Sequence, residues 1–538
     1  MSTGKAKLLR QMMADGIRYI FGNPGTVEQG ILDELRQYSE IQYIVSLQES
    51  VAVAMADGYA RAKGLPAVVQ LHSGVGLGNG IGMLYQAYRG HSPLIVIAGE
   101  AGIQYDAMDA QMACDLVKMA EPVTKYAVRV THPASLLRLW RRAYKMAVTP
   151  PMGPVFLSLP LDILDMENEE EVLAAPKIDF EASPLDEQAA VIAKALAGAF
   201  RPVILAGDGV SASGAVKELE HCAQLAGIPV YGVNSSCLNI SQTSPYYRGD
   251  LGHMFGENSK KAVQDADVVL LLGTYAFPEV FPSLQMPFRA DARIYHIDLD
   301  AYEIAKNHPV TLGLCASPKQ ALNKINKELE RTALPHRQLN SKEFRKDTDV
   351  RQQDGTITAY FMDAISHITD EHLIIFDEAL TASGYIARYL PRTLEGTFFQ
   401  TRGGSLGVGI PGGMGIQLAY PNKKVIAFTG DGGSMYTIQA LYTAKRYHIP
   451  VKMVICNNRR YHLLDQNLNV YWKEHGISAH SYPDCFSLEP VIDFAALARS
   501  MGIDGIRVDK RSSRKAGLFG EAISRRLKYC IVFVICIK

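Results

Sequence analysis

The sequence predicts an α/β protein with three domains, each built from a parallel sheet flanked by helices. Short apolar runs typical of buried strands alternate with helical stretches through most of the chain, which is the order that parallel sheets require. At 538 residues the chain is too long for one hydrophobic core and suits about three domains. Two polar, irregular stretches divide it into blocks of ordinary domain size.

The two dividing stretches lie at residues 166–184 and 333–355. Both lack apolar periodicity and carry mixed charge or proline, as linkers do. We therefore expect an N-terminal domain at 1–165, a central domain at 185–332 and a C-terminal domain at 356–538.

The composition argues against several classes of function. The chain has 55 basic and 55 acidic residues, so its zero net charge gives no electrostatic argument for binding nucleic acid or an acidic membrane surface. Its 8 cysteines show neither CxxC pairs nor zinc-site spacing, and buried free thiols are expected. The opening stretch, 1–16, predicts an amphipathic helix rather than a signal peptide. The longest strongly apolar run, CIVFVICI at 530–537, is too short to cross a bilayer and predicts a buried strand. We expect a cytoplasmic protein with no membrane or nucleic-acid partner.

The N-terminal domain offers two ionisable side chains at the ends of predicted elements. Glu49 begins a predicted helix whose small residues allow close packing against a neighbour. His72 ends an apolar strand, LPAVVQLHS, where a histidine can move protons near neutral pH. A carboxylate such as Glu49 is costly to bury without a hydrogen-bonding partner. The following GVGLGNG lacks the register of a dinucleotide fingerprint, and we interpret it as a backbone turn that lines the site.

The C-terminal domain contains a predicted β-α-β unit at 425–458. An apolar strand ends at GDGG, a helix is predicted next, and the strand 451–456 ends at two asparagines. The predicted helix has apolar side chains near one face, namely Met435, Ile438, Leu441 and Tyr442.

Two oxygen-bearing side chains of this unit predict a magnesium site. Because strand C-termini lie side by side in such units, Asp431 and Asn458 should meet at one edge of the sheet. A carboxylate and an amide oxygen suit Mg²⁺, which prefers to be shared with a diphosphate. The phosphates could approach the backbone at three glycines of the turn, Gly430, Gly432 and Gly433.

The spacing of these motifs resembles that of thiamine-diphosphate enzymes. GDG followed by NN, with one helix and one strand between them, is similar to the cofactor motif of the decarboxylase and acetolactate-synthase superfamily. Within the first block, three stretches resemble the pyrimidine-binding domain of that superfamily and look most like benzoylformate decarboxylase: FGNPGT (21–26), LQESVAVAMADGYAR (47–61) and LHSGVGLGNG (71–80). The resemblance covers nearly the whole chain and implies the three-domain architecture of these enzymes.

The resemblance implies roles for individual residues. Glu49 would bond to the aminopyrimidine ring of thiamine diphosphate and stabilise its imino tautomer, while His72 and Thr26 match an active-site histidine and serine. In DEALTASG (377–384), Thr381 would donate its hydroxyl to the diphosphate, and Leu406 would support the bent cofactor. The carbonyl of Arg460 would complete the magnesium site with Asp431 and Asn458. Further cofactor contacts are implied at Gly430, Gly432, Gly433, Tyr436 and Tyr461.

Each implied role has a plain structural alternative. Glu49 could be an acid favoured by the dipole at a helix N-terminus, and His72 a strand-end residue bonded to backbone. Thr26 could be a turn or capping hydroxyl, and Leu406 an ordinary core leucine. A second GDG, at 207–209, is followed by Asn234 without a second asparagine, and we interpret it as structural, although some relatives hold FAD or ADP in this domain.

The sequence departs from benzoylformate decarboxylase in the expected substrate pocket. The stretch 273–284 contains no histidine, and Glu279 or Val280 stands where a second catalytic histidine is expected. Gln400 and Asn467 replace two pocket phenylalanines. The asparagine pair is followed by arginine where glycine is usual, and the His-His pair of pyruvate-type decarboxylases is absent around 104–111.

Three hypotheses follow. The first is a thiamine-diphosphate and Mg²⁺-dependent lyase that decarboxylates a small 2-oxo acid to an aldehyde without oxidation. The second is a carboligase similar to acetolactate synthase, which transfers the activated group to a second carbonyl compound. The third, a binding protein without activity, fits poorly with Glu49 and both metal-ligand positions. The resemblance also implies a homodimer or homotetramer with active sites at the subunit interface.

Overall fold

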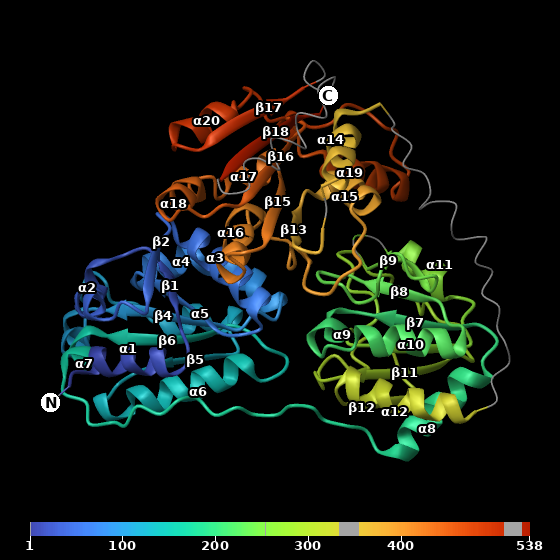
Figure 1. Ribbon diagram of the computed structural model, residues 1–538, viewed down its shortest axis with the longest axis horizontal. Coiled ribbons are helices and arrows are strands. Elements are labelled where there is room, and N and C mark those ends of the chain that lie inside the picture. Colours follow the sequence, from blue (N-terminus) through green and yellow to red (C-terminus); the bar gives the residue numbers. More distant parts are fainter. Residues whose placement is uncertain are drawn as a thin grey trace. The chain divides into compact units, whose positions relative to one another are not determined.

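The computed structural model describes residues 2–252, 254, 256–332, 355–368, 370–509 and 530–537 (Figure 1). It contains three parallel six-stranded sheets flanked by helices, as the sequence predicts. Each sheet lies within one of the three predicted domain ranges. The predicted linker at 166–184 contains no helix or strand. The second predicted linker, at 333–355, lies almost wholly outside the described residues.

The first sheet belongs to the N-terminal part of the chain. Trp140 and Leu9 are fully buried in its core. In order across the sheet, its strands are β2 (Gln42–Val45), β1 (Tyr19–Gly22), β3 (Ala67–Leu71), β4 (Leu94–Glu100), β6 (Val155–Pro160) and β5 (Tyr126–Arg129). Its α-helices are α1 (Gly4–Ala14), α2 (Gln29–Glu34), α3 (Glu49–Lys63), α4 (Ser73–Arg89), α5 (Leu116–Ala120), α6 (Leu136–Val148) and α7 (Leu161–Asp165).

The second sheet forms the centre of a separate compact unit, which also takes in residues 387–400. In order across the sheet, its strands are β12 (Leu312–Cys315), β11 (Arg293–Asp298), β10 (Val268–Leu272), β7 (Pro202–Ala206), β8 (Val230–Val233) and β9 (Tyr247–Leu251). Its helices are α8 (Asp186–Gly198), α9 (Asp208–Ala212), α10 (Val216–Ala226), α11 (Glu257–Val263) and α12 (Pro318–Arg331).

The third sheet lies in the C-terminal part of the chain, and most of it shares a compact unit with the first sheet. Its strand order is β14 (Phe398–Gln400), β13 (Leu373–Glu378), β15 (Lys424–Gly430), β16 (Lys452–Asn457), β18 (Ile531–Cys536) and β17 (Asp504–Val508). Its helices are α14 (Ile357–Ser366), α15 (Ser383–Tyr389), α16 (Gly409–Ala419), α17 (Asp431–Met435), α18 (Ala440–Arg446), α19 (His462–Glu474) and α20 (Phe494–Ser500). The apolar run at 530–537 is the buried strand β18, as predicted.

Two local predictions need correction. GVGLGNG (74–80) is not a turn but part of helix α4. Glycine lowers the intrinsic tendency to form a helix, but tertiary packing outweighs that tendency here. A Cβ atom at Gly80 would lie 3.2 Å from the Leu71 side chain, so the close packing of α4 favours a residue without a side chain at this position. The single helix predicted after Asp431 is split into α17 and α18. Met435 and Tyr442 are exposed, while Ile438 and Leu441 are buried, so the four side chains do not share one buried face.

Helix α3 packs against α16 of the same chain, at a crossing made of small residues. A Cβ atom at Gly58 would overlap the carbonyl oxygen of Gly412, and one at Gly415 would overlap that of Met55. The two backbones therefore touch where only glycine fits. This contact joins the helix that begins at Glu49 to the C-terminal sheet.

Replacing Gly415 by alanine is expected to destabilise the protein by about 1–3 kcal/mol or more, because a methyl group would have to displace the Met55 backbone. Gly198→Ala is the matched control: it ends helix α8 with nothing within 4 Å, so stability should change by less than about 1 kcal/mol. Denaturant unfolding measures both variants. Equal unfolding midpoints for the two would show that the crossing is not as tight as described.

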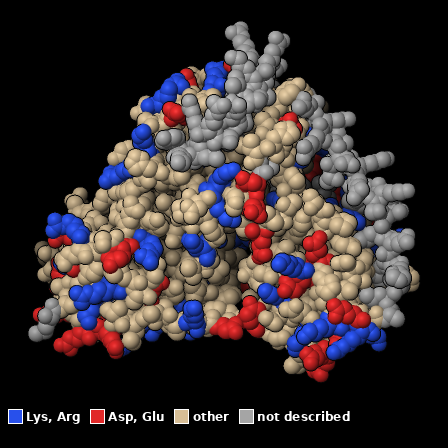
Figure 2. Space-filling view, viewed as in Figure 1, with Lys and Arg blue, Asp and Glu red and all other residues tan. Residues whose placement is uncertain are grey.

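The surface carries charges of both signs. On the face drawn in Figure 2, basic and acidic side chains are interspersed, in keeping with the equal numbers of the two kinds. No helix among the described residues is both long and apolar enough to cross a membrane. All eight cysteines are free, and Cys222 and Cys456 are buried.

Candidate active site

Glu49 is a buried carboxylate held by two neutral amides. It is the first residue of α3 and only 5% exposed. The side-chain amides of Asn23 and Asn79 donate to its two oxygens, at 3.2 and 3.0 Å. The N-terminus of α3 is capped by Gln48, whose side chain accepts from the Val51 amide. Glu49 is therefore not needed as the helix cap. Two donors offset part of the cost of burying the carboxylate and leave lone pairs for a further partner.

His72 is paired with a second buried acid, Glu28. The ring Nδ1 lies 2.9 Å from Glu28 Oε2, and Glu28 Oε1 accepts from the amide of Gly99 at 2.9 Å. Burial raises the pKa of Glu28, although the bonds from His72 and Gly99 oppose the shift. Since Nδ1 faces Glu28, Nε2 is the ring nitrogen left for a further partner.

Two glycines allow these groups to lie close together. A Cβ atom at Gly25 would overlap the His72 ring, and one at Gly76 would lie 3.2 Å from His72 and 3.3 Å from Glu49 Oε1. Glu49 and His72 therefore flank the same glycine of α4. Thr26 is exposed, immediately after Gly25. We call Asn23, Glu28, Glu49, His72 and Asn79 the N-terminal half-site.

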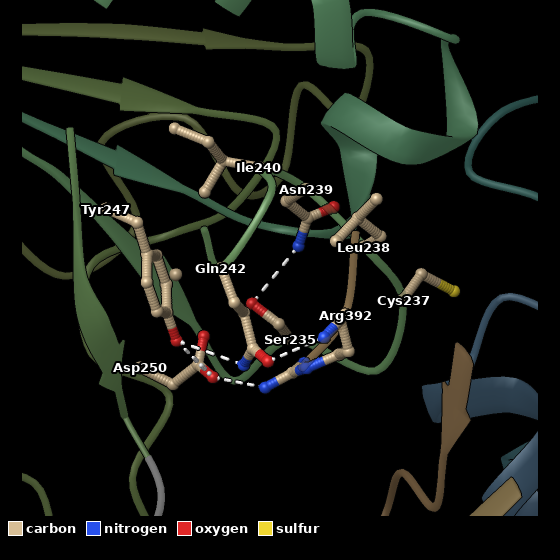
Figure 3. A pocket seen from close by; sticks show the side chains of 10 residues that line it. Ser235, Cys237, Leu238, Asn239, Ile240, Gln242, Tyr247, Asp250 and Arg392 are labelled. Carbon is tan, nitrogen blue, oxygen red and sulfur yellow. Dashed lines mark hydrogen bonds and ion pairs between the residues drawn. The ribbon is translucent and has the colours of Figure 1, made fainter. Parts of the chain in front are cut away.

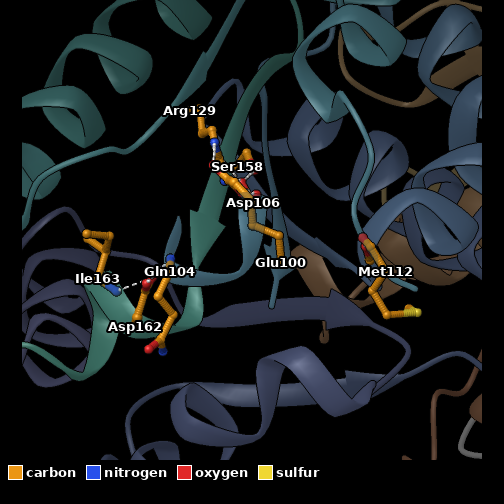
Figure 4. A network of polar contacts seen from close by, with 9 residues as sticks. Glu100, Gln104, Asp106, Met112, Arg129, Ser158, Asp162 and Ile163 are labelled. Atoms are coloured by element: carbon orange, nitrogen blue, oxygen red, sulfur yellow. Dashed lines mark hydrogen bonds and ion pairs between the residues drawn. The ribbon is translucent and has the colours of Figure 1, made fainter. Parts of the chain in front are cut away.

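The segment after β4 contacts Ser73, the residue that follows His72. The Met112 carbonyl oxygen accepts from the Ser73 hydroxyl at 3.1 Å. Arg129 holds the start of the segment, because its guanidinium bonds to both Glu100 and Asp106 at 2.7–2.9 Å (Figure 4). The Arg129 bonds lower the pKa of Asp106. An ion-pair network thus holds Glu100 and Asp106 together, at the start of the stretch where the sequence lacks a His-His pair.

The C-terminal half-site is built from the ends of two neighbouring parallel strands, β15 and β16. Asp431 follows β15 and is 5% exposed; its oxygens accept from the amides of Gly432 at 2.8 Å and Arg459 at 2.5 Å. Asn457 ends β16, and Asn458 Oδ1 accepts from the Arg460 amide at 2.9 Å. Asp431 and the asparagine turn therefore meet at one sheet edge. Burial raises the pKa of Asp431.

The residue after the two asparagines is an arginine, but its backbone has a conformation that glycine usually adopts. Arg459 has φ +58°, a left-handed value that favours glycine. The next residue, Arg460, is anchored by a two-bond contact from its guanidinium to the buried Asp465, at 2.6 and 2.8 Å. Asp465 also lies 3.1 Å from His462 Nδ1. The backbone that carries the expected Arg460 carbonyl ligand is thus held by side-chain contacts.

The predicted tyrosines lie next to the GDGG turn. A Cβ atom at Gly432 would overlap the Tyr461 ring, and one at Gly407 would lie 2.6 Å from Tyr436. Tyr436 is exposed, and Tyr461 is partly exposed. Burial and the nearby Tyr436 both raise the pKa of Tyr461.

Thr381 and Leu406 lie on two further segments. Asp377 accepts from the Ala379 amide and the Ser383 hydroxyl, both at 2.9 Å, and so shapes the loop around Thr381. Leu406 is partly exposed and precedes Gly407. The C-terminal half-site consists of Thr381, Leu406, Asp431, Asn458, the Arg460 carbonyl, Tyr436, Tyr461, Gly430, Gly432 and Gly433.

The chemistry of these groups fits thiamine diphosphate and Mg²⁺. Among the described residues, no group of three His, Cys, Asp or Glu is placed to bind a metal. The expected ligands are instead one carboxylate, one amide oxygen and one backbone carbonyl, which suit Mg²⁺ when phosphates complete the shell. A Cβ atom at Gly430 would have nothing within 4 Å, so the backbone there is open to a ligand.

No hydrogen bond or ion pair in the described part of the chain connects the two half-sites. The bonds of the buried Glu49 stay with Asn23 and Asn79, and those of Asp431 stay with its own turn. Each half-site is thus a separate arrangement of side chains within one chain.

The two amide partners of Glu49 were missed in the sequence. Asn23 lies in FGNPGT and Asn79 in LHSGVGLGNG, both of which the sequence singled out. Neither motif shows that its asparagine faces Glu49, because that contact depends on how α3 and α4 pack.

The buried acids Glu28 and Glu378 were missed as well. Their partners are distant in sequence, and His72 lies 44 residues from Glu28. Glu28 follows FGNPGT by two residues, and Glu378 lies within DEALTASG. Closeness to these motifs could have directed attention to both acids, but it does not indicate a role for either.

The second GDG turn is held by hydrogen bonds within the central unit. Asp208, in the second GDG, accepts from the amides of Ser236 and Cys237 and from Asn239 Nδ2, at 3.0–3.2 Å. In the adjacent pocket, Arg392 pairs with Asp250 at 2.5 Å (Figure 3). These contacts give Asp208 a structural role, in line with the sequence interpretation.

Residues of the expected substrate pocket have mixed environments. Glu279 is 9% exposed within the central unit, and burial raises its pKa, whereas Val280 is 61% exposed. Gln400 donates its backbone amide to the Ser236 carbonyl at 2.8 Å. Asn467 lies on α19. Of these side chains, Val280 is the one most open to solvent.

Three protein-family models match successive parts of the chain. They are "Thiamine pyrophosphate enzyme, N-terminal TPP binding domain" at residues 2–119, "central domain" at 189–325 and "C-terminal TPP binding domain" at 381–534. Glu49 and His72 fall in the first match, and Asp431 and Asn458 fall in the last.

Individual proteins give the same result. A probable acetolactate synthase large subunit from Methanocaldococcus jannaschii is 28% identical, over 99% of this chain and 92% of that protein. Benzoylformate decarboxylase from Pseudomonas aeruginosa is 27% identical, over 94% of this chain and 93% of that protein. The structure of a thiamine diphosphate-dependent 4-hydroxybenzoylformate decarboxylase from Rhodococcus jostii RHA1 matches with a TM-score of 0.87 and 25% identity, over 99% of both chains. Together with the two half-sites, these matches show that the chain belongs to the thiamine pyrophosphate enzymes, in the superfamily of decarboxylases and acetolactate synthases.

Proposed function

We propose that this enzyme uses thiamine diphosphate and Mg²⁺ to decarboxylate a small 2-oxo acid to an aldehyde. The observation that carries the proposal is a buried carboxylate, Glu49, in one half-site and an oxygen-rich turn, Asp431 with Asn458, in the other. When bound, the cofactor supplies a nucleophilic carbon and an electron sink. The similarity to benzoylformate decarboxylase supports the lyase reaction.

The chain's own residues would bind and move protons. Asp431, Asn458 and the Arg460 carbonyl would hold Mg²⁺ against the diphosphate, with Thr381 as a hydroxyl donor. Glu49 would hold a proton at its carboxylate, opposite the pyrimidine nitrogen. His72 would give or take a proton at Nε2, oriented by Glu28 at Nδ1. Leu406 would support the cofactor, and Tyr436 and Tyr461 would exclude water from the turn.

A carboligase is the second candidate, because the chain is as similar to acetolactate synthases as to benzoylformate decarboxylase. The polar residues at positions 400 and 467 also favour a substrate or acceptor more polar than an aromatic acid. The two reactions share the half-sites and differ in whether a second carbonyl compound takes up the activated group.

A screen of 2-oxo acids separates the candidates. With Mg²⁺ and thiamine diphosphate, we expect carbon dioxide and an equal amount of aldehyde from at least one small 2-oxo acid. A ketol formed only when an aldehyde or second 2-oxo acid is present would favour the carboligase. If neither carbon dioxide nor ketol forms with any acid although cofactor binds, both candidates are wrong.

We further infer that the complete site forms between two chains, in a homodimer or homotetramer. Within one chain each half-site closes on its own partners, and no described bond joins them. A dimer with two-fold symmetry would bring the N-terminal half-site of one chain to the C-terminal half-site of the other. The free cysteines fit a reducing compartment such as the cytoplasm.

Mixing two defective chains tests whether a complete site is shared between subunits. Glu49→Gln damages the N-terminal half-site and Asp431→Ala the C-terminal half-site. In a mixed dimer with shared sites, one site carries both changes and the other carries neither. Equal amounts of randomly assembled chains should therefore regain about one quarter of wild-type activity, because half of the dimers are mixed and half of their sites are intact.

The opposite result is equally clear. If both half-sites of one site came from the same chain, every site in the mixture would carry a defect and no activity would return. Recovery on mixing thus requires that Glu49 and Asp431 serve the same cofactor from different chains.

A further inference from the structure

Glu378, the last residue of β13, is a carboxylate inside the C-terminal domain. It is 1% exposed. Its Oε2 accepts from the Gly409 amide at 2.5 Å and from the Thr429 hydroxyl at 3.2 Å, and its Oε1 accepts from the Gly407 amide. All of these partners are neutral.

The partners of Glu378 belong to the segments that carry the C-terminal half-site. Gly407 follows Leu406, and Thr429 precedes the GDGG turn. A Cβ atom at Gly433, within that turn, would lie 3.3 Å from Glu378 Oε1. The strand that ends at Glu378 continues into the loop of Thr381. One carboxylate thus connects three chain segments that are distant in sequence.

Gly407 is held on both sides of its peptide. Its amide donates to Glu378, and its carbonyl oxygen accepts from the Thr437 hydroxyl at 2.6 Å. Its φ of +92° suits glycine, and a side chain there would meet Tyr436. The position of Leu406 therefore depends directly on the bond between Glu378 and Gly407.

Packing alone does not explain an acid at this position. Burial raises the pKa of Glu378 to about 7, and the amides of Gly409 and Gly407 oppose the shift. An apolar side chain of similar volume would fill the space without the cost of desolvating a carboxyl group. What an apolar residue could not do is accept from both amides and fix the direction of the chain between them.

We propose that Glu378 is a positioning residue, which holds Leu406 and the GDGG turn in register so that bound cofactor keeps its reactive shape. The cofactor part of this inference rests on the proposed function. The part that concerns the protein alone does not, and it can be tested in the cofactor-free enzyme.

The first experiment measures amide hydrogen exchange in the cofactor-free Glu378→Gln variant. A glutamine side chain has one oxygen, so one of the two glycine amides loses its acceptor in either orientation. Exchange in a peptide that covers residues 406–409 should become about 10-fold faster or more. Asp377→Asn is the matched control: it neutralises a buried acid in the same strand, but the two bonds described for it, from Ala379 and Ser383, go to one oxygen, which asparagine keeps. It should leave exchange at 406–409 unchanged.

The second experiment is a double-mutant cycle with Leu406→Ala, read by deuterium exchange at the thiazolium carbon of bound cofactor. Each single variant should slow that exchange by about 10-fold or more, since small misplacements are costly. The double variant should be slowed by clearly less than the product of the two single effects, because part of the effect of Glu378 passes through Leu406. Calorimetry measures cofactor affinity in the same variants, because a displaced GDGG turn would weaken diphosphate binding.

The outcomes separate the two proposals. Unchanged amide exchange at 406–409, or additive effects in the cycle, would overturn the positioning role. If Glu378→Gln lowers the melting temperature but leaves deuterium exchange at the thiazolium carbon unchanged, Glu378 has a structural role only. If the wild-type protein binds no thiamine diphosphate, the proposed function fails, while the amide-exchange result still decides whether Glu378 holds the loop.

Discussion

Replacing Glu49 by glutamine is expected to slow deuterium exchange at the thiazolium carbon of bound thiamine diphosphate by roughly 10²- to 10⁴-fold, the usual contribution of a general acid or base. Glutamine keeps the size of the side chain. The amides of Asn23 and Asn79 can turn to present an oxygen or a nitrogen, so the pocket should survive. What is lost is the carboxylate that we propose holds the proton. The measurement needs no substrate, and calorimetry checks that the variant still binds cofactor.

His72→Ala provides the comparison. Its ring pairs with Glu28 and makes no described bond to Glu49, so we expect it to act on substrate atoms rather than on the cofactor. Ring exchange should stay within a factor of about 3, while turnover of a 2-oxo acid falls by roughly 10²-fold or more. If His72→Ala slows ring exchange as much as Glu49→Gln does, the division of roles is wrong. His72 would then belong to cofactor activation.

The strand ends of the candidate site could be predicted from the sequence because sheet periodicity is local. Alternating elements place Asp431 and Asn458 at one edge of a parallel sheet, and the bond from Arg459 to Asp431 shows that the two strand ends meet. The helix start at Glu49 was predictable for the same reason: a polar residue precedes a long run of small and apolar residues.

The glycines of α4 could not be assigned correctly from sequence. Local propensity favours a turn at GVGLGNG, yet the helix forms because Gly76 and Gly80 pack against side chains of α3 and β3. That packing is tertiary and leaves no local signal. The same holds for the break between α17 and α18, where the Thr437 hydroxyl bonds to the carbonyl of Gly407, a residue distant in sequence.

The sequence also failed to predict the roles of two buried acids. Glu28 and Glu378 gain their partners from residues far along the chain, and their stabilisation comes from amides that the fold supplies. A sequence shows an acid but not the amides that offset the cost of its burial. Glu28 contacts His72 directly, and Glu378 bonds to Gly407, the residue after Leu406; the sequence identified His72 and Leu406 but not the two acids.

Asp431→Ala is expected to weaken Mg²⁺-dependent binding of thiamine diphosphate by about 100-fold or more. Loss of a residue that merely supports a metal ligand typically costs about 10- to 100-fold, and Asp431 is expected to be a direct ligand. It also orders the turn, through the amides of Gly432 and Arg459. Calorimetry with and without Mg²⁺ measures the loss, and Asn458→Ala should act in the same direction.

Asp208→Ala is the matched control, since it removes the same residue from the other GDG motif. The bonds described for its carboxylate stay within the central unit, so melting temperature should fall while cofactor affinity stays the same. Equal affinity loss in Asp208→Ala and Asp431→Ala would mean that the effect is general destabilisation. Unchanged affinity in Asp431→Ala would remove the metal site from the proposal, because a direct ligand cannot be lost from a shared Mg²⁺ without weakening its hold on the diphosphate.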